Sequence, residues 1–219
     1  ELPGGTSLDD YDVIDNGDWE LNAKGPYVAH SWNPGNSNCS AATDDRLGDC
    51  LDDLTGWLDD NPIEVPLLVF VDMKANSNPA AAWNPDEIAK LDNFVRSYLG
   101  NRVYSYRDLA AHLAPNANRS GLKTKGWPTI SALKGKIIVA FTGGYYGNVN
   151  ARMNDARTLL AAETPAGPVS FLCPDVDAGD PDEISGTIDG ISATDSALYF
   201  CTNMQADSHD EDTLSRSAK

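Results

Sequence analysis

The sequence is short of positive charge and of long apolar runs. It has 16 Lys and Arg residues against 33 Asp and Glu residues, and its formal net charge is −17. Such a surface repels the phosphates of nucleic acids, so the composition argues against a general nucleic-acid binder. No apolar run reaches the roughly 18 residues that a membrane-spanning helix needs. The first residues also lack the basic start and apolar stretch of a secretory leader, so we expect a mature or cytosolic chain.

Two phosphate-binding motifs of nucleotide-binding proteins are also missing. The chain contains neither G-x-G-x-x-G nor a P-loop. A doubly wound open sheet usually carries a glycine-rich first turn, so this architecture is the second choice. No C-x-x-C spacing is present either, which disfavours a zinc site.

The four cysteines form two groups along the chain. They are Cys39, Cys50, Cys173 and Cys201. An even count in two groups predicts two disulfides, and we expect Cys39–Cys50 and Cys173–Cys201 among the three connectivities that are open. Two N-x-S sequons, at Asn38 and Asn118, fit a chain that lies outside the cytoplasm. The chain is therefore predicted to be secreted.

Apolar runs alternate with helical patterns along most of the chain, as in β/α units around a parallel sheet. The clearest strand covers residues 66–72 because its apolar run is continuous, which is typical of a strand covered on both faces. The other predicted strands are 11–15, 27–30, 102–105, 136–142, 169–173 and 197–202. The predicted helices are 49–59, 85–99, 106–113 and 153–162.

This alternation, with about seven strands, predicts an α/β fold of the eight-stranded TIM-type barrel kind, in a complete or an incomplete form. We expect a single barrel domain over residues 1–204. The remaining residues, 205–219, are predicted to be a polar C-terminal tail.

Polar residues interrupt the apolar strands at a few places. Asp10 and Asp12 lie two residues apart in one strand, Asp72 and Lys74 follow the clearest strand, and His30 ends a third strand. Active sites of barrels are built at the carboxyl ends of their strands. Three carboxylates that meet there predict a divalent cation, Ca²⁺ or else Mg²⁺, with Lys74 facing a phosphate and His30 acting as an acid or base. Helix caps, turns or a plain Asp72–Lys74 ion pair are the structural alternatives.

Aromatic residues near these strand ends are candidates for binding a ring. Trp32 lies two residues after His30, and Tyr145 and Tyr146 lie in a glycine-rich loop after the strand 136–142. The two tyrosines are candidates to stack on a sugar or an inositol ring or to hydrogen-bond a headgroup, and Trp32 is a candidate for lining the site. An ordinary surface loop is the structural alternative for the tyrosines. We expect His112, in the middle of a helix, to be structural, and His209, in the polar tail, to be solvated.

An ordered series of motifs carries a family resemblance. It begins with Asp10-Tyr11-Asp12-Val13 and Tyr27-Val28-Ala29-His30-Ser31, and continues with Leu54-x-x-Trp57-Leu58-x-x-Asn61-Pro62. It ends with residues 66–74, Pro-Leu-Leu-Val-Phe-Val-Asp-Met-Lys, and residues 127–139, which read Trp-Pro-Thr-Ile-x-x-Leu-Lys-Gly-Lys-Ile-Ile-Val. The series resembles the phosphatidylinositol-specific phospholipase C-like phosphodiesterase superfamily, above all its calcium-dependent branch. The sphingomyelinase D branch is a near relative by pattern.

The resemblance implies a role for each strand-end residue. Asp10, Asp12 and Asp72 would be metal ligands, His30 the general acid and Lys74 a phosphate contact. The family also has an earlier strand ending in the general-base His, and none of the residues before Asp10 is a histidine. A fragment, a partner chain or homo-oligomer that completes the barrel, and a descendant without catalysis would each explain this difference.

Two hypotheses of function follow. The first is a calcium-dependent phosphodiesterase that acts on a phospholipid headgroup by acid–base catalysis. The second is a catalytically inactive protein on the same scaffold that binds a headgroup or a sugar.

Overall fold

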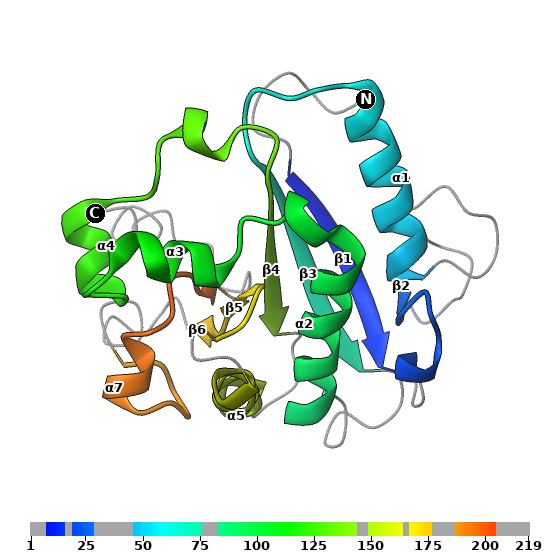
Figure 1. Ribbon diagram of the computed structural model, residues 1–219. Coiled ribbons are helices and arrows are strands. Elements are labelled where there is room, and N and C mark those ends of the chain that lie inside the picture. Colours follow the sequence, from blue (N-terminus) through cyan, green and yellow to red (C-terminus); the bar gives the residue numbers. More distant parts are fainter. Residues whose placement is uncertain are drawn as a thin grey trace.

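The computed structural model describes residues 8–15, 19–28, 46–75, 83–143, 149–163, 167–176 and 187–204 of the 219-residue chain, and within the strand Leu8–Asp15 it describes the side chain of Val13 alone. Its main element is a five-stranded sheet (Figure 1) with the strand order β2-β1-β3-β4-β5. The strands are β1 (Leu8–Asp15), β2 (Tyr27–Val28), β3 (Leu67–Ala75), β4 (Ile137–Gly143) and β5 (Phe171–Cys173). β1, β3, β4 and β5 run parallel, and β2 pairs antiparallel with β1.

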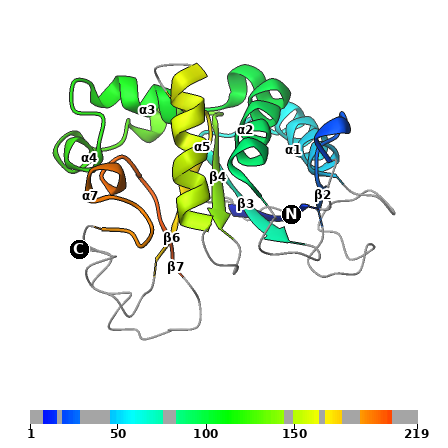
Figure 2. The same cartoon turned by 90° about the horizontal axis from the view of Figure 1, so that it is seen from below.

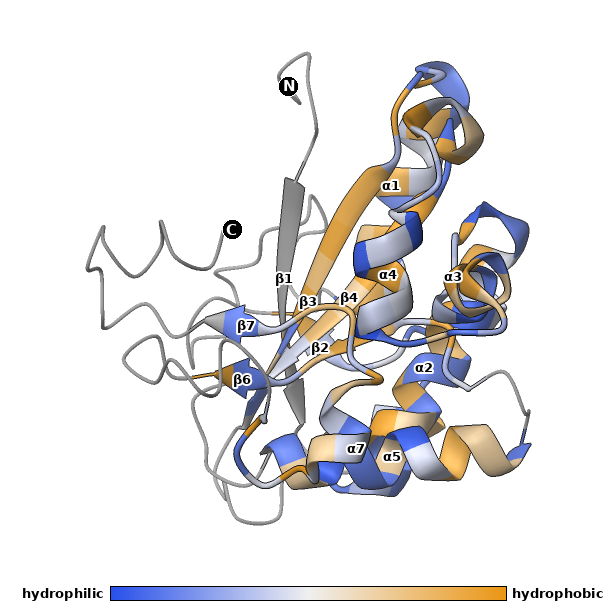
Figure 3. Ribbon diagram, turned by 90° about the vertical axis from the view of Figure 1, so that its left-hand side faces the viewer, coloured by the Kyte–Doolittle hydropathy of each residue, from blue (hydrophilic) through white to orange (hydrophobic). Residues whose placement is uncertain are grey.

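Three long helices cover one face of this sheet. They are α1 (Leu47–Asp60), α2 (Pro85–Leu99) and α5 (Val149–Glu163), which lie side by side in Figure 2. Alternate residues of β3 and β4, such as Val69, Val71, Val139 and Phe141, are buried in one core cluster with residues of these helices. Because side chains alternate along a strand, the residues between them lie on the other face. Figure 3 shows how hydrophobic β3 and β4 are along most of their length.

The other face of the sheet carries a second apolar cluster. It includes Phe70, Ala140 and Phe171 from three neighbouring strands, together with Leu109 and Leu113 of α3 (Tyr106–Leu113). The further helices are α4 (Arg119–Lys125), α7 (Ala193–Ser196) and three 3-10 turns at Trp19–Leu21, Gly100–Arg102 and Ile130–Leu133. β6 (Asp175–Val176) and β7 (Asn203–Met204) pair parallel in a separate two-stranded sheet.

The sequence of α2 explains where this helix begins and ends. The side chain of Asn84 accepts a hydrogen bond of 3.1 Å from the backbone N–H of Glu87, and Glu87 accepts one of 2.8 Å from the backbone N–H of Asn84. Pro85 suits the first turn because its nitrogen carries no hydrogen that the helix would leave unpaired. Gly100, with a φ of 56°, follows the last helical residue, as predicted.

A buried aspartate connects α2 to β5. Asp92 is fully buried, and its carboxylate accepts backbone N–H bonds from Val169 at 3.0 and 3.1 Å and from Ser170 at 2.6 Å. These two N–H groups lie just before β5 begins. A buried carboxylate is tolerated when such donors compensate for lost hydration. Asp92 therefore links α2 to the backbone that leads into β5.

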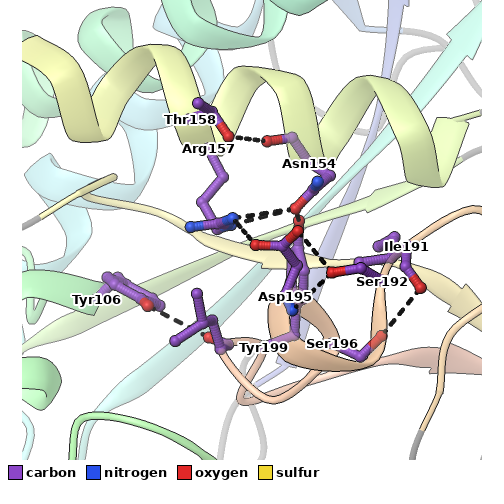
Figure 4. Close-up of polar contacts among 10 residues, drawn as sticks. Tyr106, Asn154, Arg157, Thr158, Ile191, Ser192, Asp195, Ser196 and Tyr199 are labelled. Carbon is purple, nitrogen blue, oxygen red and sulfur yellow. Dashed lines mark hydrogen bonds and ion pairs between the residues drawn. The ribbon is translucent and has the colours of Figure 1, made fainter.

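A polar network holds the segment around α7 against α5 (Figure 4). Arg157 forms an ion pair of 2.7 Å with Asp195, and the hydroxyl of Tyr199 donates a hydrogen bond of 3.0 Å to Asn154. Tyr106 of α3 donates its hydroxyl hydrogen to the backbone oxygen of Leu198 at 3.2 Å. The chain leading to β7 is thus fixed from two sides.

The structure confirms the α/β class and most of the predicted elements, and it corrects two strands. Residues 102–105 were predicted to be a strand, but Arg102 ends a 3-10 turn and Ser105 caps α3. The segment between them makes one isolated bridge, from Val103 to Ile137. Residues 197–202 follow α7 and lead into β7, which begins only at Asn203. In both places aromatic and β-branched residues pack into the apolar cores but do not form the hydrogen bonds of a strand pair. Residue composition alone therefore predicted the wrong secondary structure. Among the described residues the sheet does not close on itself, and the barrel stays a prediction.

No helix in the described ranges has the length and apolar character needed to cross a lipid bilayer.

Candidate functional site

A row of residues crosses the carboxyl ends of the four parallel strands. The register pairs Asp72 of β3 with Asp12 of β1 on one side and with Thr142 of β4 on the other. Thr142 pairs in turn with Cys173 of β5. Asp72 therefore lies at the centre of this row, on the face turned away from α1, α2 and α5.

Asp72 and Lys74 form an ion pair at the end of β3. The Nζ atom of Lys74 lies 2.5 Å from Oδ2 of Asp72, and the Asp72 side chain is 20% exposed. The other carboxylate oxygen, Oδ1, is buried and has no hydrogen-bond partner among the described residues. Leaving a buried acceptor unpaired costs about 1–3 kcal/mol, and more for a charged group. A cation at Oδ1 would remove this cost, so the arrangement fits a bound metal ion.

The end of β3 is anchored by an aromatic side chain. The indole N–H of Trp83 donates a hydrogen bond of 2.7 Å to the backbone oxygen of Lys74, and the ring of Trp83 packs 5.7 Å from that of Trp19. Trp83 is 2% exposed and has a φ of 50°, which is uncommon for a residue with a side chain. The backbone that carries Lys74 is therefore held from the side of the apolar core.

Asp175 lies in the same region, although it was not among the site residues predicted from the sequence. It begins β6, two residues after Cys173. Its Oδ1 atom accepts a hydrogen bond of 2.7 Å from the amide of Asn203 in β7. Burial, together with the charge of Asp72, raises the pKa of Asp175 to about 6, while the hydrogen bond from Asn203 and the charge of Lys74 act in the opposite direction. The pKa of Asp175 therefore depends on the charges of both Asp72 and Lys74.

The sequence did contain a signal for Asp175. The rule that found Asp72 was a polar residue directly after an apolar strand, and Asp175 follows the predicted strand 169–173 with Pro174 between them. Asn203 follows the last apolar run in the same way. Neither was singled out because the two strands involved are very short, with two residues each in the β6–β7 pair.

The described residues include only part of the predicted site. Asp10 and Asp12 are placed by backbone register alone, with Asp10 paired to Phe70. The remaining residues of the predicted site lie outside the described residues: His30, Trp32, Tyr145 and Tyr146. Within the described residues no group of three or more metal-ligating side chains is present. The predicted ligand set of Asp10, Asp12 and Asp72 is therefore untested.

The cysteines and histidines agree with their predicted structural roles where they are described. Cys173 and Cys201 form the predicted disulfide, with a Cα–Cα distance of 4.9 Å. Cys50 is also disulfide-bonded, and Cys39 lies outside the described residues. The Nε2 atom of His112 lies 3.2 Å from the backbone oxygen of Gly126, so this histidine contacts the end of α4. His209 lies outside the described ranges.

Parallel strands with covering helices and an acid–lysine pair at the strand ends define the class: an α/β protein with its polar site at the carboxyl edge of the sheet. The sequence model of the Ca²⁺-dependent phosphoinositide phospholipase C family matches residues 35–165, which is more than half of the chain. The chain therefore belongs to this family, and its function is phospholipase C-like. No curated protein matches the chain significantly.

Solved structures of bacterial phospholipases share the fold. A calcium-dependent phosphoinositol-specific phospholipase C from a Pseudomonas species, described as an apo form and myoinositol complex, is 21% identical with a TM-score of 0.70. The alignment covers 97% of this chain and 71% of that one. A Ca²⁺-dependent phosphatidylinositol-specific phospholipase C from Streptomyces antibioticus is 23% identical, has a TM-score of 0.68, and is aligned over 92% of this chain and 66% of its own.

Proposed function

We propose that this chain is a secreted phosphodiesterase that cleaves a phosphoinositide headgroup with the help of Ca²⁺, on a TIM-type barrel. The observation that carries the proposal is the Oδ1 atom of Asp72, which is buried and has no partner among the described residues, beside the Asp72–Lys74 ion pair. Membership of the calcium-dependent family supports the choice of ion. The similar Pseudomonas enzyme, described as a myoinositol complex, supports an inositol headgroup.

The proposed roles follow from the chemistry of each residue. Asp72, Asp10 and Asp12 would hold the ion, because Ca²⁺ prefers carboxylate oxygens and tolerates loose geometry. A bound Ca²⁺ supplies positive charge that stabilises the negative charge on the phosphoryl group. Lys74 adds a second positive charge at the same edge of the sheet, where it would contact a phosphate oxygen.

The chemistry of hydrolysis requires two proton movements. The attacking water loses a proton to a general base as its oxygen bonds to phosphorus, and the leaving oxygen gains one from a general acid as its own bond to phosphorus breaks. We assign the second step to His30, whose ordinary pKa near neutrality suits a general acid. Trp32, Tyr145 and Tyr146 would line the ring of the headgroup.

The test is the release of inositol phosphate from phosphatidylinositol vesicles. Wild-type protein is assayed with Ca²⁺ and with excess chelator, beside Asp72→Asn and a control variant, Asp155→Asn, which changes an exposed acid of α5. We expect turnover that the chelator abolishes, that Asp72→Asn reduces at least about 100-fold, and that the control retains.

Two other outcomes are informative. Calcium-dependent binding of the vesicles with no turnover would show a headgroup-binding protein on the same scaffold. Turnover that is equal with calcium and with chelator would contradict the proposed use of the ion.

A further inference from the structure

The positive charge of the chain is concentrated in one stretch without acids. Residues 109–154 contain six Lys and Arg residues and no Asp or Glu residue, so this stretch carries a formal charge of +6. The other ten Lys and Arg residues face all 33 acids, which leaves −23 on the rest of the chain. A protein that repels anions over most of its surface thus has one part that attracts them.

Four lysines of this stretch form two Lys-x-Lys pairs on residues 123–136, which we call the basic segment. The segment runs from the end of α4 through the 3-10 turn Ile130–Leu133 to the start of β4 (Figure 1). The pairs are Lys123 with Lys125 and Lys134 with Lys136. They lie at most about 30 Å apart, because the nine residue steps from Lys125 to Lys134 span no more even when fully extended. The two pairs therefore suit an elongated anionic ligand.

Most of the charge on the basic segment is not neutralised by acids. Lys125 and Lys136 each donate a hydrogen bond to a backbone oxygen, which orients the ammonium groups and leaves their charge in place. Lys134 lies 2.5 Å from a carboxylate oxygen of Glu64, and both side chains are more than half exposed. Among the described residues no other acid forms an ion pair with this segment. Exposed ion pairs are weak, so an anionic ligand can replace Glu64.

An exposed tryptophan lies between the two lysine pairs. The side chain of Trp127 is 42% exposed, and its ring packs 5.5 Å from that of Phe171 in the apolar cluster. The indole is thus held in place while a large part of it stays accessible to a ligand. Aromatic rings offer a flat apolar surface on which another ring can stack.

We infer that the basic segment is a docking surface for an acidic polysaccharide, whose anionic groups contact the two lysine pairs and whose sugar ring stacks on Trp127. The Cys173–Cys201 disulfide favours a polysaccharide over a nucleic acid, because disulfides persist in oxidising compartments outside the cytosol. The inference is independent of calcium and of turnover, and it stands or falls separately from the proposed function.

The position of the basic segment argues against a lipid surface as its partner. The segment ends where β4 begins, at Ile137, whereas the row of strand-end residues includes Thr142. The five residue steps between them span about 17 Å of strand. A membrane docked on the segment would face the amino ends of the strands, away from Asp72. Ile130, which is 61% exposed, would suit lipid as well, so the experiment includes vesicles.

The experiment measures binding of the full chain to heparin, a sulfated polysaccharide probe, by surface plasmon resonance at physiological salt with chelator present. The variants are Lys123→Gln/Lys125→Gln and Lys134→Gln/Lys136→Gln. Each should weaken binding about 10- to 30-fold, because each lysine near a polyanionic surface contributes several-fold to affinity. The control Lys90→Gln/Arg96→Gln removes the same charge from exposed positions of α2 and should bind as wild type does.

A second probe tests the ring contact. Inorganic polyphosphate carries a dense negative charge but has no rings. Trp127→Leu should therefore weaken heparin binding about three- to tenfold and leave polyphosphate binding unchanged. Melting temperatures equal to that of wild type show that the variants are folded.

Several results would overturn the inference. Wild-type protein that does not bind heparin, or lysine variants that bind it as the control does, would show that the segment is not a polyanion site. Tighter binding to vesicles of anionic phospholipid, or to single-stranded DNA, would assign the segment to a different partner. Equal weakening of both probes by Trp127→Leu, or of neither, would show that no sugar ring stacks there.

Discussion

The Nζ atom of Lys74 lies 2.5 Å from Oδ2 of Asp72, while Oδ1 of the same carboxylate is buried without a partner among the described residues. The lysine thus competes with a cation for the negative charge of Asp72, and it also offers a positive charge to a phosphate. These two effects have opposite consequences for binding of calcium and for turnover. A buried carboxylate oxygen without a partner lowers the stability of the fold, so the arrangement is better explained by binding than by folding.

The first prediction uses this opposition. Lys74→Gln should raise calcium affinity about three- to tenfold, because affinity depends on the net charge around the ion. The same variant should lower turnover about 100-fold, because one stabilising charge at the phosphoryl group is lost. Calorimetry and the phosphatidylinositol assay measure the two effects. A variant with unchanged calcium affinity and full turnover would show that Lys74 has only a structural role.

The second prediction concerns the Cys173–Cys201 disulfide, whose two cysteines lie two residues before the start of β6 and two residues before the start of β7. The bond joins residues 28 apart, and in the chain-entropy account such a cross-link contributes about 3–4 kcal/mol. The double variant Cys173→Ala/Cys201→Ala should lose about this much in the free energy of unfolding, measured in urea. A double variant with the stability of wild type would contradict this contribution.

The third prediction concerns Asp92. Asp92→Leu removes the acceptor of the backbone N–H groups of Val169 and Ser170 and leaves both buried donors unpaired. The free energy of unfolding should fall by about 2–5 kcal/mol, since each orphaned donor costs about 1–3 kcal/mol. Asp86→Leu, at an exposed position of the same helix, is the control and should change stability by less than about 1 kcal/mol. Equal losses in both variants would contradict the role given to Asp92.

The fourth prediction concerns pH. Burial, with the charge of Asp72, raises the pKa of Asp175 from its ordinary value of 3.8 to about 6. In this interval the folded chain binds more protons at Asp175 than the unfolded chain, so the contribution of this group to stability falls as pH rises from about 4 to about 6. The fall is at most about 3 kcal/mol, because one pKa unit corresponds to about 1.4 kcal/mol. Asp175→Asn should remove this part of the pH dependence of the free energy of unfolding, measured by chemical unfolding without calcium. The same pH dependence in the variant as in wild type would show that Asp175 does not cause it.

The sequence predicted elements best where local and tertiary preferences agree. The α2 helix has an N-cap, a proline in the first turn and a terminating glycine, and its bounds match the prediction. β3 and β4 are continuous apolar runs, and both were found. Residues 197–202 are also apolar and aromatic, but Tyr199 and Phe200 pack into two separate cores from a turn and form no ladder. Only the tertiary contacts decide between these states.

The candidate site was predicted only in part from the sequence. Asp72 and Lys74 were found because they follow a long, unmistakable strand. Asp175 was missed because its strand β6 has two residues, and the residue that pairs with it, Asn203, lies 28 positions further along the chain. Such long-range register is not visible in a single sequence.

The central claim is that the strand-end acids bind calcium and that the chain hydrolyses phosphoinositide only when they do. The most direct test follows inositol phosphate release from phosphatidylinositol vesicles as calcium is titrated, for wild type, Asp72→Asn and Asp155→Asn. The claim predicts that turnover in wild type and in the Asp155 variant rises with calcium occupancy measured by calorimetry, while the Asp72 variant shows neither binding nor turnover. Turnover in the Asp72 variant equal to wild type, or in wild type at full chelation, would contradict it.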